Sequence, residues 1–213
     1  MTLETTVGRR GCRYDHAVAV RGTRRFSQAV SEGDGISVIA DVSDADAARL
    51  AESHGAEAVV VRGELVGVRE ATELPILWCA NGPLSDAVRA GADACLLVVE
   101  RERGDAERLE ALHGEALELG LDCVVEVRSE EELELALERL DPEIFLLAAG
   151  GDGDAIERAL ELLPDVPAGK LAVAEVAATT RERIAELERA GVDGVIVGAQ
   201  DVAELVGAGP PEV

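Results

Sequence analysis

Lysine is almost absent from this sequence: Lys170 is the only lysine among 20 basic residues in a chain of 213. The cationic side chains of any site must therefore be arginines, which are poor general acids because their pKa exceeds about 12. Aromatic residues are also scarce, at 2% of the chain. A core built instead from Val, Leu, Ile and Ala is typical of parallel strands that are buried on both faces.

The patterns that indicate metal, redox or dinucleotide chemistry are missing as well. The four cysteines show no Cys-x-x-Cys spacing, and the three histidines lie far apart. We therefore expect no metal site, no cofactor and reduced thiols, as in a cytoplasmic protein. No GxGxxG motif follows the first predicted strand, which counts against a dinucleotide-binding fold.

Membrane and nucleic-acid partners are not expected either. No apolar run reaches about 18 residues, and the N-terminal MTLETTVGRRGCRYDH lacks an apolar signal core. The formal net charge of −23 would repel nucleic acid and anionic membranes. We expect a small-molecule ligand and a monomer or weak homodimer. The excess of glutamate and arginine is typical of a GC-rich, thermophilic or salt-adapted source, and composition does not choose among these.

A repeating strand–helix pattern begins at residue 36. Strands are predicted over 36–42, 56–63, 74–80, 92–100, 121–128, 142–151, 170–177 and 192–200. Helices are predicted over 44–55, 83–90, 105–120, from Ser129, from Asp152 or Asp154 to Leu163, from Thr179 or Thr180 to Ala190, and over 201–206. Almost no helix separates the second and third strands.

This alternation predicts an α/β protein with a single (β/α)8 TIM barrel. Alternating strands and helices imply a parallel sheet, and eight units imply closure. The barrel is expected over residues 36–213. Residues 1–35 form an irregular, arginine-rich N-terminal extension with a short helix near 23–31, and residues 1–22 are expected to be loosely held. An open, doubly wound sheet is the alternative.

From about Arg25 to Ala203 the chain resembles indole-3-glycerol phosphate synthase, the ring-closing, decarboxylating lyase of tryptophan synthesis. The resemblance is carried by RRFSQAV leading into ISVIADV, and by GADACLLVV, LGLDCVVEVRSEEELELAL and LAVAEVAATTRERIAELERAGVDGVIVG. It is good in the strands and poor in the loops after strands one, two, three and six. The loops after the first three strands are also shorter than is usual in the family.

The resemblance implies which carboxylates the site keeps. Asp41 ends the first strand, where the synthases carry a glutamate, and Glu126 and Glu175 match glutamates of strands five and seven. Gly198 after strand eight is also kept. Because TIM barrels build their sites at the carboxyl ends of the strands, these residues should meet at one mouth.

The resemblance also implies that lysines and phosphate-binding groups are lost. Ser43 and Cys79 stand where the synthases carry lysines, the second of which acts as a general acid. The other replacements are Ala148 for an asparagine, Val176 for a serine, Ala177 for a phosphate-loop glycine, and Ala199 and Gln200 for Glu-Ser. Asp201 adds a negative charge to the last helix, so we expect phosphate to bind weakly.

Nine residues are therefore candidates for the site. The catalytic candidates are Glu126, Glu175, Asp41 and Cys79, and the ligand-binding candidates are Trp78, Arg62, Arg128, Val176 and Gly198. We expect Trp78, Cys79 and Val176 to form an apolar wall. The acidic mouth is also expected to include Glu64 and Glu100. Arg62, Arg101 and Arg128 should neutralise part of its charge.

Each candidate has a plainer interpretation. Glu126 and Glu175 are either an acid/base pair that cannot easily ionise together, or carboxylates bridged by arginine or solvated. Cys79 is more readily an apolar filler than a nucleophile, since no histidine lies near it in sequence. Residues 150–153 (GGDG) suit a helix cap better than an anion cradle.

Three functions remain open from the sequence. The first is a synthase-like lyase of the tryptophan lineage with lost or altered activity. The second is a non-catalytic barrel that binds a metabolite or a partner. The third is a different enzyme that uses carboxylate acid/base chemistry on an unphosphorylated, planar substrate.

Overall fold

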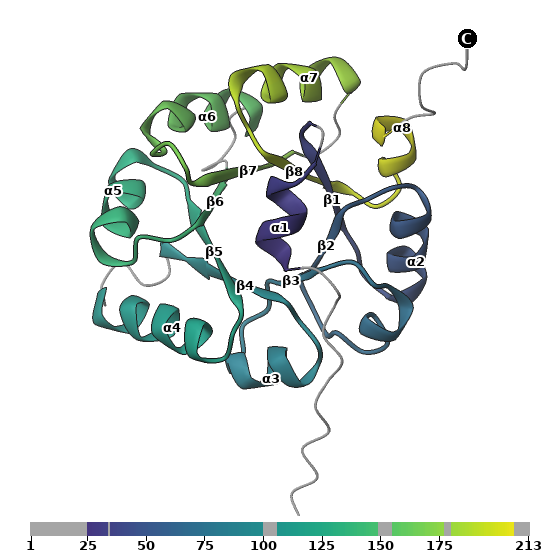
Figure 1. Ribbon diagram of the computed structural model, residues 1–213, viewed down its shortest axis with the longest axis horizontal. Coiled ribbons are helices and arrows are strands. Elements are labelled where there is room, and N and C mark those ends of the chain that lie inside the picture. Colours follow the sequence, from purple (N-terminus) through teal and green to yellow (C-terminus); the bar gives the residue numbers. More distant parts are fainter. Residues whose placement is uncertain (1–24, 34, 100–105, 149–154, 177–179, 207–213) are drawn as a thin grey trace, which may run out of the picture.

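Eight parallel strands close into a barrel in chain order, with helices around them (Figure 1). This computed structural model describes residues 25–33, 35–99, 106–148, 155–176 and 180–206. The strands are β1 Ser37–Asp41, β2 Ala58–Val61, β3 Ile76–Trp78, β4 Ala94–Val98, β5 Asp122–Val127, β6 Ile144–Leu147, β7 Leu171–Glu175 and β8 Gly194–Gly198. β8 pairs with β1 from Ser37 beside Gly194 to Asp41 beside Gly198. The predicted TIM barrel is confirmed, and the open sheet is excluded.

The helices begin and end close to the positions that their capping residues indicate. They are α1 Phe26–Ser31, α2 Ala45–Ser53, α3 Leu84–Arg89, α4 Ala106–Glu118, α5 Glu130–Arg139, α6 Ala155–Leu162, α7 Arg181–Ala190 and α8 Val202–Val206, with 3-10 turns η1 Arg69–Ala71 and η3 Leu163–Asp165. Asp44 caps α2 by accepting from the backbone N–H groups of Asp46 and Ala47, and Ser129 caps α5. Thr180 is the N-cap residue of α7, whereas Asp152, Asp154 and Thr179 lie outside the described residues.

The core has two layers because side chains alternate along each strand. Inward-facing residues fill the barrel, among them Ile39, Val60, Leu77, Val124, Ile144, Leu146, Val173 and Ile196. Outward-facing residues pack under the helices, among them Ala40, Val59, Ile76, Val125, Phe145, Ala174 and Val195. These are almost all aliphatic side chains, as the scarcity of aromatics predicts.

Helix α1 closes the amino-terminal end of the barrel. Phe26 is fully buried and packs with the interior layer. The Ser27 backbone N–H donates to Asp122 Oδ2 at 2.8 Å, Arg25 pairs with the same carboxylate, and the Ser37 hydroxyl donates to the Ala29 carbonyl at 3.0 Å. In Figure 1, α1 lies across the centre of the ring. The carboxyl ends of the strands, at the opposite side, are therefore the open mouth.

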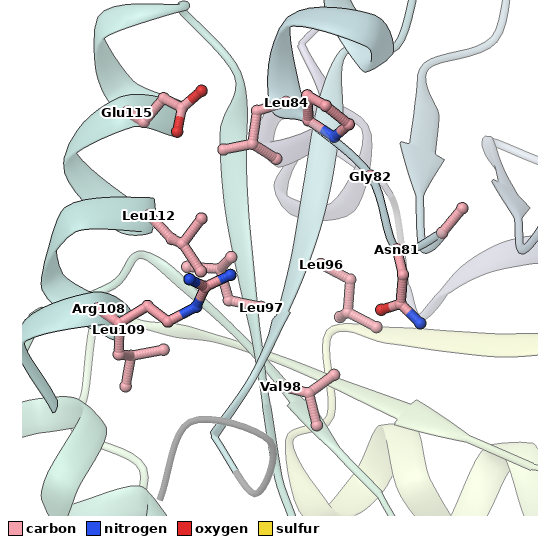
Figure 2. A pocket seen from close by; sticks show the side chains of 12 residues that line it. Asn81, Gly82, Leu84, Leu96, Leu97, Val98, Arg108, Leu109, Leu112 and Glu115 are labelled. Atoms are coloured by element: carbon pink, nitrogen blue, oxygen red, sulfur yellow. The ribbon is translucent and has the colours of Figure 1, made fainter. Parts of the chain in front are cut away.

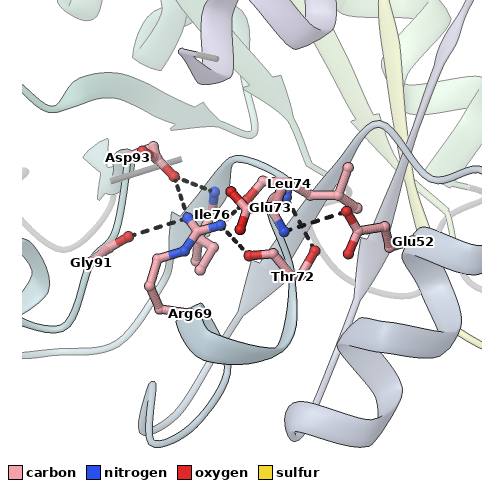
Figure 3. Close-up of polar contacts among 8 residues, drawn as sticks. All are labelled: Glu52, Arg69, Thr72, Glu73, Leu74, Ile76, Gly91 and Asp93. Atoms are coloured by element: carbon pink, nitrogen blue, oxygen red, sulfur yellow. Dashed lines mark hydrogen bonds and ion pairs between the residues drawn. The ribbon is translucent and has the colours of Figure 1, made fainter. Parts of the chain in front are cut away.

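A buried arginine organises the shortened connection between β2 and β3, where only η1 replaces a full helix. The Arg69 side chain is 9% exposed and reaches Asp93 Oδ2 at 2.9 Å and the Leu74 carbonyl at 2.9 Å (Figure 3). It also donates to the Thr72 carbonyl. Asp93 in turn accepts from the Ile76 backbone N–H at 3.0 Å. One guanidinium thus pairs with a buried carboxylate and with two carbonyl groups of this connection.

Replacing Arg69 with Met should destabilise the fold strongly. The change leaves the buried Asp93 carboxylate without its cation, and such a loss typically costs about 3–5 kcal/mol. Urea unfolding followed by circular dichroism measures it. As a control, Arg139→Met removes an ion pair with Glu110 whose side chains are about half exposed, and the expected cost is below ~1 kcal/mol. Equal losses in the two variants would contradict a structural role for the buried pair.

Candidate functional site

The mouth is formed by the last inward-facing residue of each strand. Side chains alternate along each strand, so one inward-facing residue of each strand ends the barrel interior at the mouth. By this alternation the mouth residues are Asp41, Arg62, Cys79, Val98, Glu126, Ala148, Glu175 and Gly198. The structure therefore brings together the carboxylates, Arg62, Cys79 and Gly198 that the sequence nominates. Glu100, Arg101 and Ala177 lie outside the described residues.

Arg62 crosses the mouth and pairs with two carboxylates. Its Nε lies 2.7 Å from Asp41 Oδ2, and one terminal nitrogen lies 2.8 Å from Glu175 Oε1. Since β7, β8, β1 and β2 are consecutive in the barrel, the side chain spans two intervening strands. Gly198, beside Asp41 on β8, adds no side chain to block that path.

Electrostatics hold the Arg62 charge in place. Burial lowers the pKa of Arg62, but the hydrogen bond that Arg62 donates to Asp41 and the charges of Glu175 and Asp41 outweigh burial and raise the pKa above its ordinary value. The side chains of Arg62, Asp41 and Glu175 remain 35–40% exposed. The guanidinium is therefore a permanent cation, but both carboxylates already hold it.

Glu126 has a separate arginine partner. Its side chain is 8% exposed, and Oε1 accepts from Arg128 Nε at 2.9 Å and from a terminal Arg128 nitrogen at 2.7 Å. Glu126 is thus paired with Arg128, and Glu175 shares Arg62 with Asp41. The arginine-bridged alternative describes the geometry.

Cys79 is a protonated thiol at neutral pH. Burial raises the pKa of the Cys79 thiol to about 12; Arg62 lowers it somewhat, while Glu175, Asp41 and Glu126 raise it. A thiol of this pKa is neither a ready nucleophile nor an effective proton donor near pH 7. The filler interpretation fits Cys79 better than a nucleophilic role.

Cys79 should therefore be almost inert to alkylation in the folded protein. In a Cys12→Ser background at pH 8, iodoacetamide should modify Cys79 roughly 10³-fold more slowly than an unperturbed thiol, because the thiolate fraction is so small. Peptide mass spectrometry identifies the modified site, and unfolding in guanidinium should restore the ordinary rate. Rapid modification in the folded state would show that the pKa of the Cys79 thiol is not raised in this way.

The raised pKa of Cys79 also affects the stability of the fold at alkaline pH. Up to the ordinary thiol pKa of 9.0, Cys79 is neutral in both the folded and unfolded states. Between pH 9 and 12 only the unfolded chain loses the proton, so the stability that this group contributes is lost as the pH rises. Cys79→Ala should flatten that decline in urea titrations, and an unchanged slope would count against the shift.

Trp78 and Val176 do not form a wall with Cys79. Trp78 belongs to the outer layer, and its indole Nε1–H donates to the Gly63 carbonyl at 3.1 Å. Val176 also belongs to the outer layer, although it lines a cleft at the rim. Both residues are adjacent in sequence to inward-facing residues, and strand alternation turns them to the other face.

The cleft beside β1, β7 and β8, where phosphate-binding barrels grip their ligand, is poor in free donors. It has a volume of about 510 Å³, and its lining includes Asp41, Glu175 and Asp201. The Ala199 N–H donates to the Asp41 carbonyl at 3.2 Å, and the Asp201 N–H donates to the Gly198 carbonyl at 2.9 Å. The Gln200 amide folds against Gly198, where an added side chain would collide with it. The predicted GGDG stretch, 150–153, lies outside the described residues.

Phosphate should therefore bind weakly at this cleft. We expect a dissociation constant above about 1 mM, equivalent to less than ~4 kcal/mol of binding free energy. Isothermal calorimetry with inorganic phosphate measures it. Asp201→Asn removes one repelling charge and should tighten binding, whereas Asp165→Asn, outside the cleft, should not. Saturable binding well below 1 mM by the unmodified chain would overturn this expectation.

A second cavity lies beside the mouth, and sequence patterns did not indicate it. Its volume is about 390 Å³, and we call it the side pocket (Figure 2). Its lining comes from the loop after β3, from β4 and from α4: Ala80, Asn81, Gly82, Pro83, Leu84, Leu96, Leu97, Val98, Arg108, Leu109, Leu112 and Glu115. Only folding brings residues 80–84 against α4, so no local spacing could have predicted the cavity.

The described residues contain neither a metal-binding cluster nor a membrane-spanning helix. No group of three or more His, Cys, Asp or Glu side chains among them is arranged to hold a metal ion. No helix in this part of the chain has the length and apolar character needed to cross a membrane.

Comparison with known proteins places the chain in a family. The sequence model of indole-3-glycerol phosphate synthase matches residues 62–204. This chain belongs to that family. Synthases from a Geobacillus species and from Halalkalibacterium halodurans are 32% and 30% identical to it over 171 and 193 residues. Those matches cover 71% and 81% of this chain, and 64% and 72% of the relatives. The chain thus spans less than two thirds of the Geobacillus synthase.

Solved structures support the fold alone. The aldolase QR15 superposes with a TM-score of 0.62 at 17% identity, covering 80% of this chain and 91% of its own. Thiamine phosphate pyrophosphorylase from Pyrococcus furiosus gives a TM-score of 0.59 at 18% identity, covering 84% and 95%. At such low identities the two structures show only that this chain shares their barrel architecture.

Proposed function

We propose that this chain is an indole-3-glycerol phosphate synthase-family barrel that has lost most or all ring-closing activity and binds a small, unphosphorylated molecule at its mouth. The observation that carries the proposal is the Arg62 bridge to Asp41 and Glu175, with the partly buried Cys79 thiol beside it. In the bridge, the Arg62 cation is already paired with two carboxylates. The Cys79 thiol stands where the family resemblance implies a lysine that acts as a general acid.

The chemistry of ring closure explains why these features matter. Closing a ring on a ketone requires a proton donor at the carbonyl oxygen, and an anionic substrate requires cations to hold its phosphate and carboxylate. Cys79 is too weak an acid at neutral pH to serve as that donor. Arg62 and Arg128 already pair with carboxylates, so an anionic substrate would have to compete for them.

The single lysine of the chain supports the same conclusion. Lys170 immediately precedes β7, at the amino-terminal end of the barrel, and its Nζ lies 2.6 Å from Asp141 Oδ1. The mouth is at the opposite end of that strand. Lys170 therefore stabilises the closed end and is too far along the strand to act as an acid at the mouth.

Turnover of the indole precursor should be very slow. Loss of a general acid typically lowers the rate 10²–10⁴-fold, and ordinary enzymes turn over about 10 times per second. We therefore expect less than ~0.1 per second in a fluorescence assay of indole formation, with an intact family synthase as the positive control. A rate near 1 per second that falls in a Glu126→Gln variant would refute the proposal. An equal rate in that variant would show that the signal comes from a contaminating enzyme and not from the mouth of this chain.

A further inference from the structure

We infer that a groove between α7 and α8, on the outside of the barrel, binds a small organic ammonium ion with an apolar body. The groove has a volume of about 500 Å³, and its lining comes from the segment before β1, from β1, from the loop between α2 and β2 and from both helices. We call it the α7–α8 groove. It shares no lining residue with the cleft beside β8, so the inference is independent of any lyase activity at the mouth.

The groove lies where the last helix ends early. α8 has five residues, whereas α7 beside it has ten. In Figure 1, α8 lies between α7 and α2 on the outside of the ring of strands. Because α8 ends at Val206, Val38 on the outer face of β1 lines the groove instead of lying under a full-length helix. A barrel of this type normally covers each strand with a helix, so the short α8 accounts for the hollow.

Apolar side chains make up most of the accessible wall of the groove. The lining includes Ile36, Val38, Ile184, Leu205 and Val206, and its accessible surface is more apolar than polar. Val206 is 42% exposed, although a surface helix usually turns its apolar side chains toward the core. A volume of about 500 Å³ lies within the range of small-molecule sites, which combine apolar walls with a few polar groups. The occupant should therefore be a compact hydrocarbon body with one polar end.

Two carboxylates determine the expected charge of that end. Glu57, just before β2, is partly buried, and Glu188, in the last turn of α7, is exposed. Both Glu57 carboxylate oxygens lie 3.4 Å from the position that a Cβ would take on Gly33, and Glu188 Oε1 lies 2.7 Å from the equivalent position on Gly35. Since these glycines are two residues apart, the carboxylates meet at one end of the groove. Within the described part of the chain, neither side chain forms an ion pair or accepts a hydrogen bond.

An ammonium ion complements this arrangement better than a neutral or anionic group. Its three N–H donors can be shared between two carboxylates, and hydrogen bonds between ions are stronger than neutral ones. Residues 207–213, which follow α8 in the sequence, contain no basic side chain that could take this role. Arg181, which also lines the groove, lies about two turns from Glu188 on α7, and its Nε donates to the Glu204 carbonyl. The Arg181 charge disfavours a cation at the opposite end of the groove and so orients the ligand.

The test titrates the full, ¹⁵N-labelled chain at pH 7 in 0.15 M salt with cyclohexylammonium and three comparison ligands: cyclohexanol, cyclohexanecarboxylate and methylammonium. We expect saturable amide chemical-shift changes at Gly33, Gly35, Ala185 and Val206 with cyclohexylammonium, and a dissociation constant on the order of 1 mM. The comparison ligands should bind at least about tenfold more weakly, because each lacks either the positive charge or the apolar body. Methylammonium also measures how far any cation is attracted to a protein of this net negative charge.

Variants assign the charge effect to the two carboxylates. Glu57→Gln and Glu188→Gln should each weaken cyclohexylammonium binding about threefold, and the double variant about tenfold. Glu134→Gln is the matched control, since it removes the same charge from an exposed position on α5 and should leave binding unchanged. Equal affinity for cyclohexanol or methylammonium, full binding by the double variant, or shifts centred on Asp41 and Gly198 would each overturn the inference. Absence of saturation at 50 mM cyclohexylammonium, the top of the titration, would do so as well.

Discussion

Closure of eight parallel strands is the constraint on which the rest of this structure depends. A closed barrel admits every second side chain of each strand, so each strand contributes one residue to the mouth and has no freedom to exchange it for its neighbour. Cys79 therefore faces the interior while Trp78, one residue earlier, lies under the outer helices. The chemistry of the mouth follows from eight particular positions, and a shift of one residue in any strand would turn its mouth residue outward.

At the mouth, the charges of the arginines and carboxylates compensate one another. Arg62 holds both Asp41 and Glu175, and Arg128 holds Glu126. The carboxylates that the family resemblance led us to regard as an acidic field are thus largely neutralised from within the barrel. What remains is a mouth whose described arginines already pair with carboxylates, and whose partly buried Cys79 thiol stays protonated at neutral pH.

Charged residues at the two ends of the barrel have different environments. At the closed end, Asp93 and Asp122 are buried and accept from backbone N–H groups as well as from arginines. At the mouth, Asp41, Glu175 and Arg62 are more than a third exposed. The hydrogen bonds and ion pairs of the buried carboxylates at the closed end indicate a structural role. The exposed charges at the mouth lie at the carboxyl ends of the strands, where barrels place their binding sites.

The sequence by itself determined the eight strand–helix units, the end of the barrel at which the site lies, and most residues of the mouth, because periodicity and capping are local properties. Contacts between distant residues were decided only by the tertiary structure. The Arg62 bridge joins β2 to β7, Arg69 holds the β2–β3 connection through Asp93, and the side pocket joins the loop after β3 to α4. Direction and reach of a long side chain depend on packing from several elements at once. For that reason the sequence could name Glu126, Glu175 and their neighbouring arginines, but could not say that each carboxylate is already paired.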